Sequence, residues 1–157
     1  MKFYNKCMLT LTDMLLRLGA AVVVGAIIGL ERELMGKEAG IRTDLMVAAG
    51  AAIFTMVGIT LPYVVQVGNL ADVIARNSGF LTVVGNIVVG IGFLGAGVIL
   101  HEGNKVRSLT TAATVWVVAS LGILCGIGLF SFAFLSAIGL ALVLFITRKI
   151  GVKEIPE

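Results

Sequence analysis

Charged residues are scarce in this sequence. Asp, Glu, Lys and Arg make up 13% of the 157 residues, whereas hydrophobic residues make up 59%. Soluble domains typically contain about 25% charged and 45–50% apolar residues. The mean hydropathy of +1.08 points the same way. This composition excludes an ordinary soluble domain and predicts one compact membrane domain over residues 1–157.

Cysteine and histidine are also nearly absent. Cys7 and Cys125 fit neither a metal-binding spacing nor a disulfide framework, and we interpret both as small apolar residues. The single histidine, His101, is expected to lie in a loop beside Glu102. No P-loop or nucleophile–base pair is present, so the sequence does not predict an enzyme. The net charge of +3 is too small to indicate a nucleic-acid partner.

The 39 residues from Leu109 to Thr147 include no charged side chain. As one helix this segment would be roughly 60 Å long, about twice the thickness of a bilayer core. The segment must therefore fold back on itself. We expect the turn at Cys125–Gly128, because glycine tolerates the backbone angles of a tight turn.

The remaining apolar segments complete an all-α, polytopic membrane protein with the lipid bilayer as its surroundings. Pro62 is expected to end the second helix, because proline lacks the amide donor of a helix interior. Tyr63 to Asn77 is expected to form a loop, and Thr110 and Thr111 are candidates to cap the fourth helix. The five expected helices cover residues 8–30, 43–61, 79–100, 109–124 and 129–147.

The distribution of basic residues predicts the topology. Eight basic residues lie at one end of the expected bundle. This end holds the loop after helix one, the loop after helix three and the C-terminal tail. The opposite end carries three, namely Lys2, Lys6 and Arg76. The positive-inside rule then places the N-terminus outside and the C-terminus in the cytoplasm.

An internal repeat is a further hypothesis. At an offset of 65 residues, Val23–Gly25 matches Val88–Gly90, and Ile41–Thr43 matches Val106–Ser108. If the repeat is real, helices one–two and three–four are two related hairpins in parallel orientation, as in some transporters.

Charged residues that border the apolar helices form the candidate functional site. We predict a cluster at the cytoplasmic mouth of helices one to four, and the alternative is a solvated loop that only sets the topology. Glu31 and Asp44 could supply oxygen ligands to a hard cation such as Mg²⁺. Asp13 and Arg17 form either an interfacial pair near a helix end or a buried pair facing a polar cavity. The predicted cluster consists of Glu31, Arg32, Arg42, Asp44 and Arg107.

Glycines are frequent in the apolar segments and have spacings typical of helix-packing faces. We expect close packing at these positions, and a homodimer or higher oligomer built on faces such as Gly25/Gly29 and Gly122/Gly126. The alternative for the third helix is a broken backbone that lines a polar path. The eight candidate packing residues are Gly25, Gly29, Gly90, Gly92, Gly95, Gly97, Gly122 and Gly126.

Four sequence blocks together resemble the MgtC/SapB family of bacterial inner-membrane proteins. They are Gly29–Glu33, Ala39–Thr43, Gly90–Ile99, and Val106–Ala113 followed by Trp116. The resemblance implies a multi-helix membrane domain and a link to adaptation to low Mg²⁺. For family members from pathogens, the resemblance also implies a role in survival inside host cells. It further suggests action on the proton-translocating ATP synthase or on membrane potential.

The sequence departs from the family pattern at two positions, because Ser108 stands where glycine is expected and Asp44 where His or Asn is expected. Many members also carry a soluble C-terminal domain, and this chain ends ten residues after the fifth expected helix. Two functions follow as hypotheses. One is a regulator of another membrane complex under Mg²⁺ limitation, and the other is a carrier for Mg²⁺ or another ion.

Overall fold

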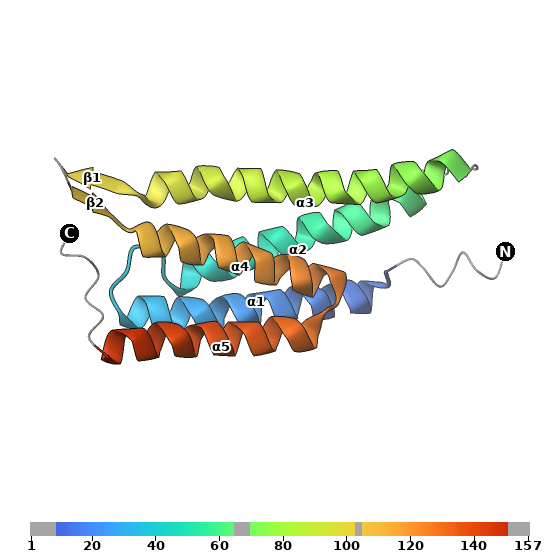
Figure 1. The fold of residues 1–157 in the computed structure, drawn as a ribbon. Coiled ribbons are helices and arrows are strands. Elements are labelled where there is room, and N and C mark those ends of the chain that lie inside the picture. Colours follow the sequence, from blue (N-terminus) through green and yellow to red (C-terminus); the bar gives the residue numbers. More distant parts are fainter. Residues whose placement is uncertain (1–8, 65–69, 103–104, 151–157) are drawn as a thin grey trace.

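The computed structural model describes residues 9–64, 70–102 and 105–150 and consists mainly of five helices that run along one common direction (Figure 1). Each helix contains a segment long and apolar enough to cross a membrane. The expected all-α membrane architecture is therefore confirmed. The helices are α1 (Leu11–Leu34), α2 (Ile41–Val64), α3 (Leu70–Val98), α4 (Leu109–Ile127) and α5 (Phe130–Lys149).

Several observed boundaries correct the expected ones. Pro62 does not end the second helix, since α2 continues to Val64. The segment from Leu70 to Asn77 is helical rather than a loop, because α3 extends beyond its membrane-spanning part. Between α3 and α4 the chain forms an antiparallel hairpin of β1 (Leu100–Glu102) and β2 (Lys105–Arg107), where only a helix end and a loop were expected. Met8, Cys7, Lys2, Lys6 and Lys153 lie outside the described residues.

Two glycines close the tight turns of the bundle. Gly36 after α1 and Gly128 after α4 have φ values of +63° and +99°, which other residues rarely adopt. After α4, the amide of Leu129 donates to the Leu124 carbonyl and that of Gly128 to the Cys125 carbonyl. These bonds satisfy carbonyls that the helix leaves free at its end. The uncharged segment thus folds back where the glycines predicted.

The helices α1, α2 and α4 pack against one another and form the centre of the molecule. On one side α3 packs against α2 and α4, and on the other α5 packs against α1 and α4. Their shared core is apolar and contains Cys125, which is fully buried as expected of a small apolar residue. Its other members include Ala21, Val24, Ile28, Ala48, Ala52, Val118 and Leu121.

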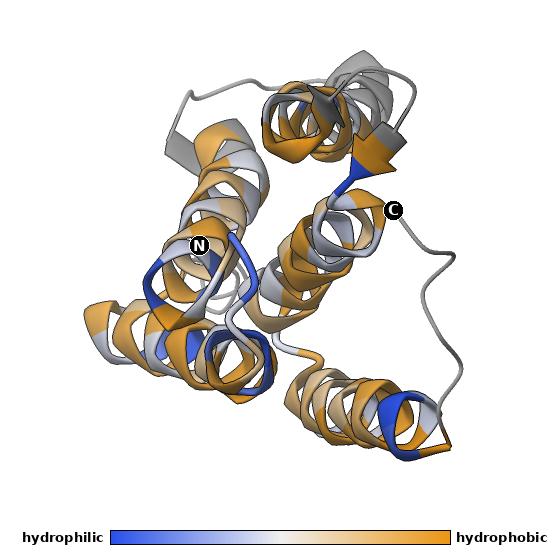
Figure 2. Cartoon of the chain, turned by 90° about the vertical axis from the view of Figure 1, so that its left-hand side faces the viewer, coloured by the Kyte–Doolittle hydropathy of each residue, from blue (hydrophilic) through white to orange (hydrophobic). Residues whose placement is uncertain are grey.

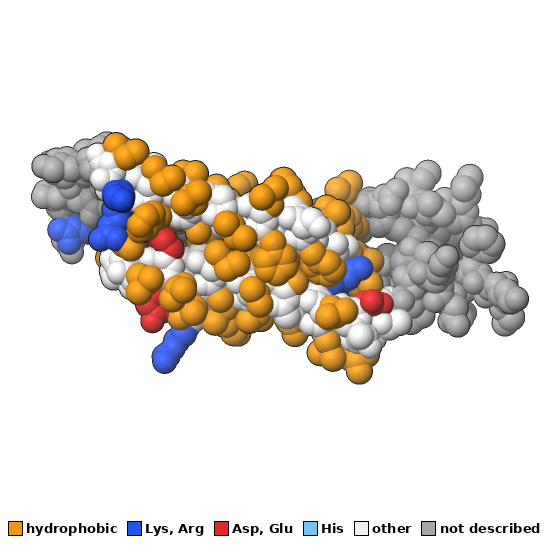
Figure 3. Space-filling view, turned by 90° about the horizontal axis from the view of Figure 1, so that it is seen from below, with side chains coloured by type: hydrophobic (Ala, Val, Ile, Leu, Met, Phe, Trp, Pro, Cys, Tyr) orange, Lys and Arg blue, Asp and Glu red, His pale blue; other side chains and the backbone are white. Residues whose placement is uncertain are grey.

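Apolar residues also cover the outside of the bundle. Hydrophobic colour extends along the outer as well as the inner faces of the helices in Figure 2. In Figure 3 an apolar belt separates two groups of charged side chains, one near each end of the molecule. A bilayer core surrounds such a belt, while the charged ends meet water and lipid headgroups.

Four of the predicted packing glycines hold the central helices in direct contact within one chain. A Cβ at Gly25 would lie 2.7 Å from the Asp44 carbonyl oxygen, and one at Gly29 would lie 2.6 Å from the Ile41 Cα. Gly122 and Gly126 approach α2 in the same way, the second at 2.7 Å from the Thr55 Cβ. Because these faces are already occupied inside the chain, they are not the oligomer faces that the sequence suggested.

The glycines of the third helix behave differently. No described atom lies within 4 Å of a Cβ built at Gly90, Gly92 or Gly97, and Gly95 has only ordinary contacts with Ala112 at 3.8 Å. Three of the four are therefore not packing positions within the chain. Nor is the backbone broken there, because α3 is a continuous helix through all of them.

Candidate functional site

A buried polar cluster lies where α1, α2 and α4 meet, at the end of the bundle that holds the α1–α2 connection (Figure 1). Its central members are Arg32 of α1, Asp44 of α2 and Thr111 of α4, which are 3%, 0% and 1% exposed. Charged side chains are rarely so deeply buried unless they are paired. This burial marks the cluster as the candidate site.

Asp44 owes its position to the glycines of α1. Gly25 and Gly29 have no side chains, so the first turn of α2 lies directly on the α1 backbone, and the Asp44 Cβ lies 3.0 Å from the position of a Cβ at Gly29. Within the described chain, neither carboxylate oxygen of Asp44 has a hydrogen-bond partner. An unsatisfied buried carboxylate costs free energy of folding. Its presence therefore points to a function other than stability.

Arg32 supplies charge that partly compensates the buried Asp44 carboxylate. It follows Gly29 by three residues and so lies on the same face of α1. Its Nη2 donates to the Thr111 hydroxyl at 2.7 Å, which ties α1 to α4. The Arg32 Nε is buried and makes no hydrogen bond with any described residue. The guanidinium thus retains one donor with which it could bind a ligand or rearrange.

Thr111 joins this buried pair to the surface. Its hydroxyl donates to Oε2 of Glu38, an exposed residue of the α1–α2 connection, at 3.2 Å. The pKa of Glu38 lies below its ordinary value, chiefly because the Ser108 side chain stabilises the ionised form. The backbone amide of Glu38 and the Thr111 hydroxyl contribute further. The Ser108 Oγ makes no hydrogen bond of normal geometry in the described chain, so we interpret its effect on the Glu38 carboxylate as that of a nearby dipole.

The other predicted members of the cluster lie apart from this centre. Glu31 follows Gly29 by only two residues and therefore points to a different side of α1 from Asp44. Its Oε2 is buried without a hydrogen bond to the described residues. Arg107 ends β2 and is partly exposed. Arg42 is exposed and lines a separate groove between α2 and α3.

This arrangement does not favour a shared metal site on Glu31 and Asp44, because their side chains diverge. Within the described ranges, no group of three or more His, Cys, Asp or Glu side chains could hold a metal ion. Glu33, next to the cluster, instead accepts a hydrogen bond from the Ile41 amide at 3.0 Å and so caps α2. Among the described residues, the cluster therefore offers a single buried carboxylate, that of Asp44, and no set of three metal ligands.

The sequence alone did not identify Thr111 or Glu38 as site residues. Thr111 was expected to cap α4, but Ser108 is the N-cap and makes no side-chain capping bond. The available signal was the position of Thr111, two residues inside a helix that follows a basic hairpin. That position could not reveal which residue of α1 lies opposite.

Asp13 and Arg17, near the other end of the bundle, have structural roles. Asp13 is exposed and forms a capping box with Thr10 at the start of α1. Arg17 donates from Nη1 to the Gly126 carbonyl at 2.6 Å, in the last turn of α4. A cation at a helix C-terminus is favourable. The pair is therefore near a helix end and not a buried pair in a polar cavity.

Comparison with known proteins identifies the family. A model of the MgtC family matches residues 18–152. The protein named MgtC from Salmonella typhimurium strain LT2 is 44% identical over 124 residues, which cover 79% of this chain and 48% of that protein. The protein named MgtC from Brucella abortus strain 2308 is 42% identical over 116 residues, covering 74% and 43%.

The chain spans about half the length of the curated relatives it matches. No solved structure matches it. The matched region contains the described helices from the first third of α1 to the end of α5, including every residue of the buried cluster. The chain therefore belongs to the MgtC family.

Proposed function

We propose that this protein is a non-enzymatic regulator in the bacterial inner membrane that binds and modulates another membrane complex when Mg²⁺ is scarce. Membership of the MgtC family supports the link to magnesium. The resemblance described above makes the proton-translocating ATP synthase the first candidate partner. In the proposed orientation the buried cluster lies at the cytoplasmic end of the bundle.

One observation favours a regulator over a carrier: the centre of the bundle is closed to ions. Beyond the cluster, the interface of α1, α2 and α4 is filled by residues such as Ala21, Val24 and Leu121. Thr55 is a buried polar residue in the middle of α2, and its hydroxyl donates a hydrogen bond to the Ala51 carbonyl of the same helix. Ion paths need polar or charged lining. Within the described chain the central interface has none that continues across the membrane.

The second candidate function is a carrier for Mg²⁺ or another ion. It is favoured by the Asp44 carboxylate, whose oxygens have no hydrogen-bond partner among the described residues. A carrier would need a second conformation in which the apolar centre opens. Ion flux therefore separates the two candidates.

The test uses purified chain in liposomes and, separately, inverted bacterial membrane vesicles with and without the chain. A regulator should show no Mg²⁺ or proton flux above that of empty liposomes and should change ATP-driven proton pumping in the vesicles. Arg32→Ala should abolish the change in pumping, whereas Lys149→Ala, an exposed basic residue at the same end, should not. Flux through liposomes that contain only this chain would favour the carrier instead.

Self-association is a separate part of the proposal. Since Gly25, Gly29, Gly122 and Gly126 pack within the chain, an oligomer must use other surfaces. The outer face of α3 is the best candidate, because only 6% of its membrane-spanning segment is buried. Crosslinking through cysteines introduced on α3, in native membranes, would test it.

A further inference from the structure

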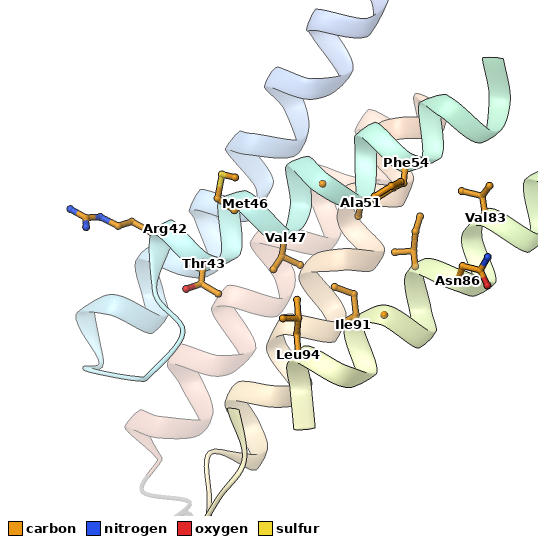
Figure 4. A pocket seen from close by; sticks show the side chains of 13 residues that line it. Arg42, Thr43, Met46, Val47, Ala51, Phe54, Val83, Asn86, Ile91 and Leu94 are labelled. Atoms are coloured by element: carbon orange, nitrogen blue, oxygen red, sulfur yellow. The ribbon is translucent and has the colours of Figure 1, made fainter. Parts of the chain in front are cut away.

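A groove between α2 and α3, separate from the buried cluster, opens on the side of the bundle. It has a volume of about 810 Å³ and its lining is almost entirely apolar (Figure 4). Met46 and Phe54 of α2 and Leu94 of α3 lie along it and are 66%, 61% and 47% exposed. Because both helices cross the membrane, the groove faces the hydrocarbon core.

Missing side chains create the room in this groove. Gly50 of α2 and Gly90 of α3 line it, and no described atom lies within 4 Å of a Cβ built at either position. In Figure 4, Val47 and Ile91 project into the space from opposite helices and leave it between them. A long side chain at Gly90 would therefore occupy space that is now open.

The length of the groove matches one leaflet of a bilayer. From Arg42 at one end to Phe54 at the other, α2 rises about 18 Å. Half of a bilayer core is about 15 Å thick. On α3 the lining residues from Leu94 to Val83 cover a similar distance in the antiparallel direction. One fatty acyl chain that starts at the membrane surface fits this length.

The end of the groove is positively charged. Arg42 and Thr43 line it in the first turn of α2, and Arg42 extends outward from the helix while Thr43 points into the groove (Figure 4). Arg42 is exposed and makes no hydrogen bond or ion pair with the described residues. Asp44, the acid of the same turn, is fully buried against α1 and points away from this mouth. Because the Glu33 carboxylate already accepts a hydrogen bond from the first amide of α2, a phosphate would be held by Arg42 and Thr43 rather than by the helix end.

We propose that this groove binds an anionic phospholipid, with one acyl chain between α2 and α3 and the headgroup phosphate at Arg42 and Thr43. Basic sites between transmembrane helices on the cytoplasmic side suit anionic lipids, which the cytoplasmic leaflet supplies. The acyl chain is surrounded by hydrocarbon both in the bilayer and in the groove, so the preference for one lipid depends on the headgroup contact. Asn86, which lines the groove far from Arg42, takes no part in holding the headgroup.

The experiment uses tryptophan fluorescence of the full chain. Trp116 is the only tryptophan, so the double variant Trp116→Phe/Phe54→Trp carries a single reporter in the groove. The protein is reconstituted in phosphatidylcholine with brominated acyl chains, which quench tryptophan on contact. Unbrominated phosphatidylglycerol is then added. We expect phosphatidylglycerol to displace the brominated lipid from the groove with an affinity about fivefold higher than that of unbrominated phosphatidylcholine. A factor of this size is expected for one basic residue near the headgroup.

Matched variants test each part of the site. Arg42→Gln should reduce the preference to about onefold, while Arg42→Lys and Lys149→Gln should keep it. Gly90→Leu should weaken quenching of the groove reporter, whereas Gly92→Leu, on the same helix but outside the groove, should not. The natural Trp116, which is 51% exposed on α4, should show no preference for phosphatidylglycerol because it contacts ordinary boundary lipid.

Three outcomes would overturn the proposal. Equal affinity for both lipids in the protein with Arg42 would show that the mouth does not select a headgroup. Loss of the preference in sodium phosphate, but not in chloride of equal ionic strength, would assign the mouth to free phosphate. A groove reporter that the brominated lipid does not quench, in protein that is dimeric by crosslinking, would show that a second copy fills the groove.

Discussion

Among single residues, Asp44 is the one whose burial most needs an explanation. Its side chain is fully buried, and no described residue forms a hydrogen bond with its carboxylate. We predict that Asp44→Asn raises the free energy of unfolding by about 1–3 kcal/mol, because it removes a buried unsatisfied charge. Thermal unfolding of both proteins in the same detergent measures this difference.

The same variant should lose the effect on proton pumping described above, since the charge facing Arg32 is gone. Higher stability with lost activity is the signature of a functional rather than a structural residue. If Asp44→Asn instead lowers the stability, the attraction of Arg32 outweighs the burial of the charge, and Asp44 belongs to a structural ion pair.

Ser108 shows how a departure from the family pattern can be understood physically. It has φ of +66°, in the left-handed region that glycine adopts most easily, and glycine is the residue expected there from the family resemblance. We predict that Ser108→Gly stabilises the protein by up to about 1 kcal/mol, because it relieves the steric conflict of a Cβ in this conformation. Chemical denaturation monitored by Trp116 fluorescence would measure the change. Ser120→Gly, in the interior of α4, should destabilise by about the same amount.

At the scale of secondary-structure elements, the junction of α1 and α4 depends on one hydroxyl. Thr111 accepts a hydrogen bond from Arg32 and donates one to Glu38. Thr111→Val keeps the shape but leaves the buried guanidinium without this partner, so we predict a loss of about 1–3 kcal/mol in unfolding free energy. Hydrogen exchange at the first turn of α4 should also become faster.

Thr114 provides the matched control on the same helix. It is 6% exposed, and its hydroxyl donates only to the Thr111 carbonyl of α4 itself. Thr114→Val should therefore change the stability by much less than Thr111→Val. Equal effects of the two variants would mean that volume rather than the interhelical hydrogen bond holds α4 in place.

The elements themselves were largely predictable, and their ends were not. The apolar runs and the glycines at the α4–α5 turn were sufficient to predict five helices. The reason is that lipid requires every backbone polar group to be satisfied within the helix. The boundary predicted from Pro62 was wrong, since the loss of one backbone hydrogen bond does not stop α2. The hairpin β1–β2 gave no clear signal, because three-residue strands are too short for a pattern.

For the whole molecule, the arrangement of the five helices places three connections or ends on one side of the membrane. The α1–α2 connection, the β1–β2 hairpin and the end of α5 lie together at one end (Figure 1). We predict that this end is cytoplasmic, because it carries most of the basic residues. Alkaline phosphatase fused after Glu157 should be inactive, whereas a fluorescent protein fused there should fluoresce. Active phosphatase would reverse the topology.

The sequence by itself determined the membrane character, the number of helices and the family resemblance, because each follows from composition or from local order along the chain. It also placed Arg32 and Asp44 among the candidate residues. Only the tertiary structure decided that Gly25 and Gly29 bring α2 onto α1, that Asp44 is thereby buried, and that Arg42 faces a different groove. The reason is rotational: a helix presents neighbouring residues to different sides, and which side meets which helix depends on packing between distant segments.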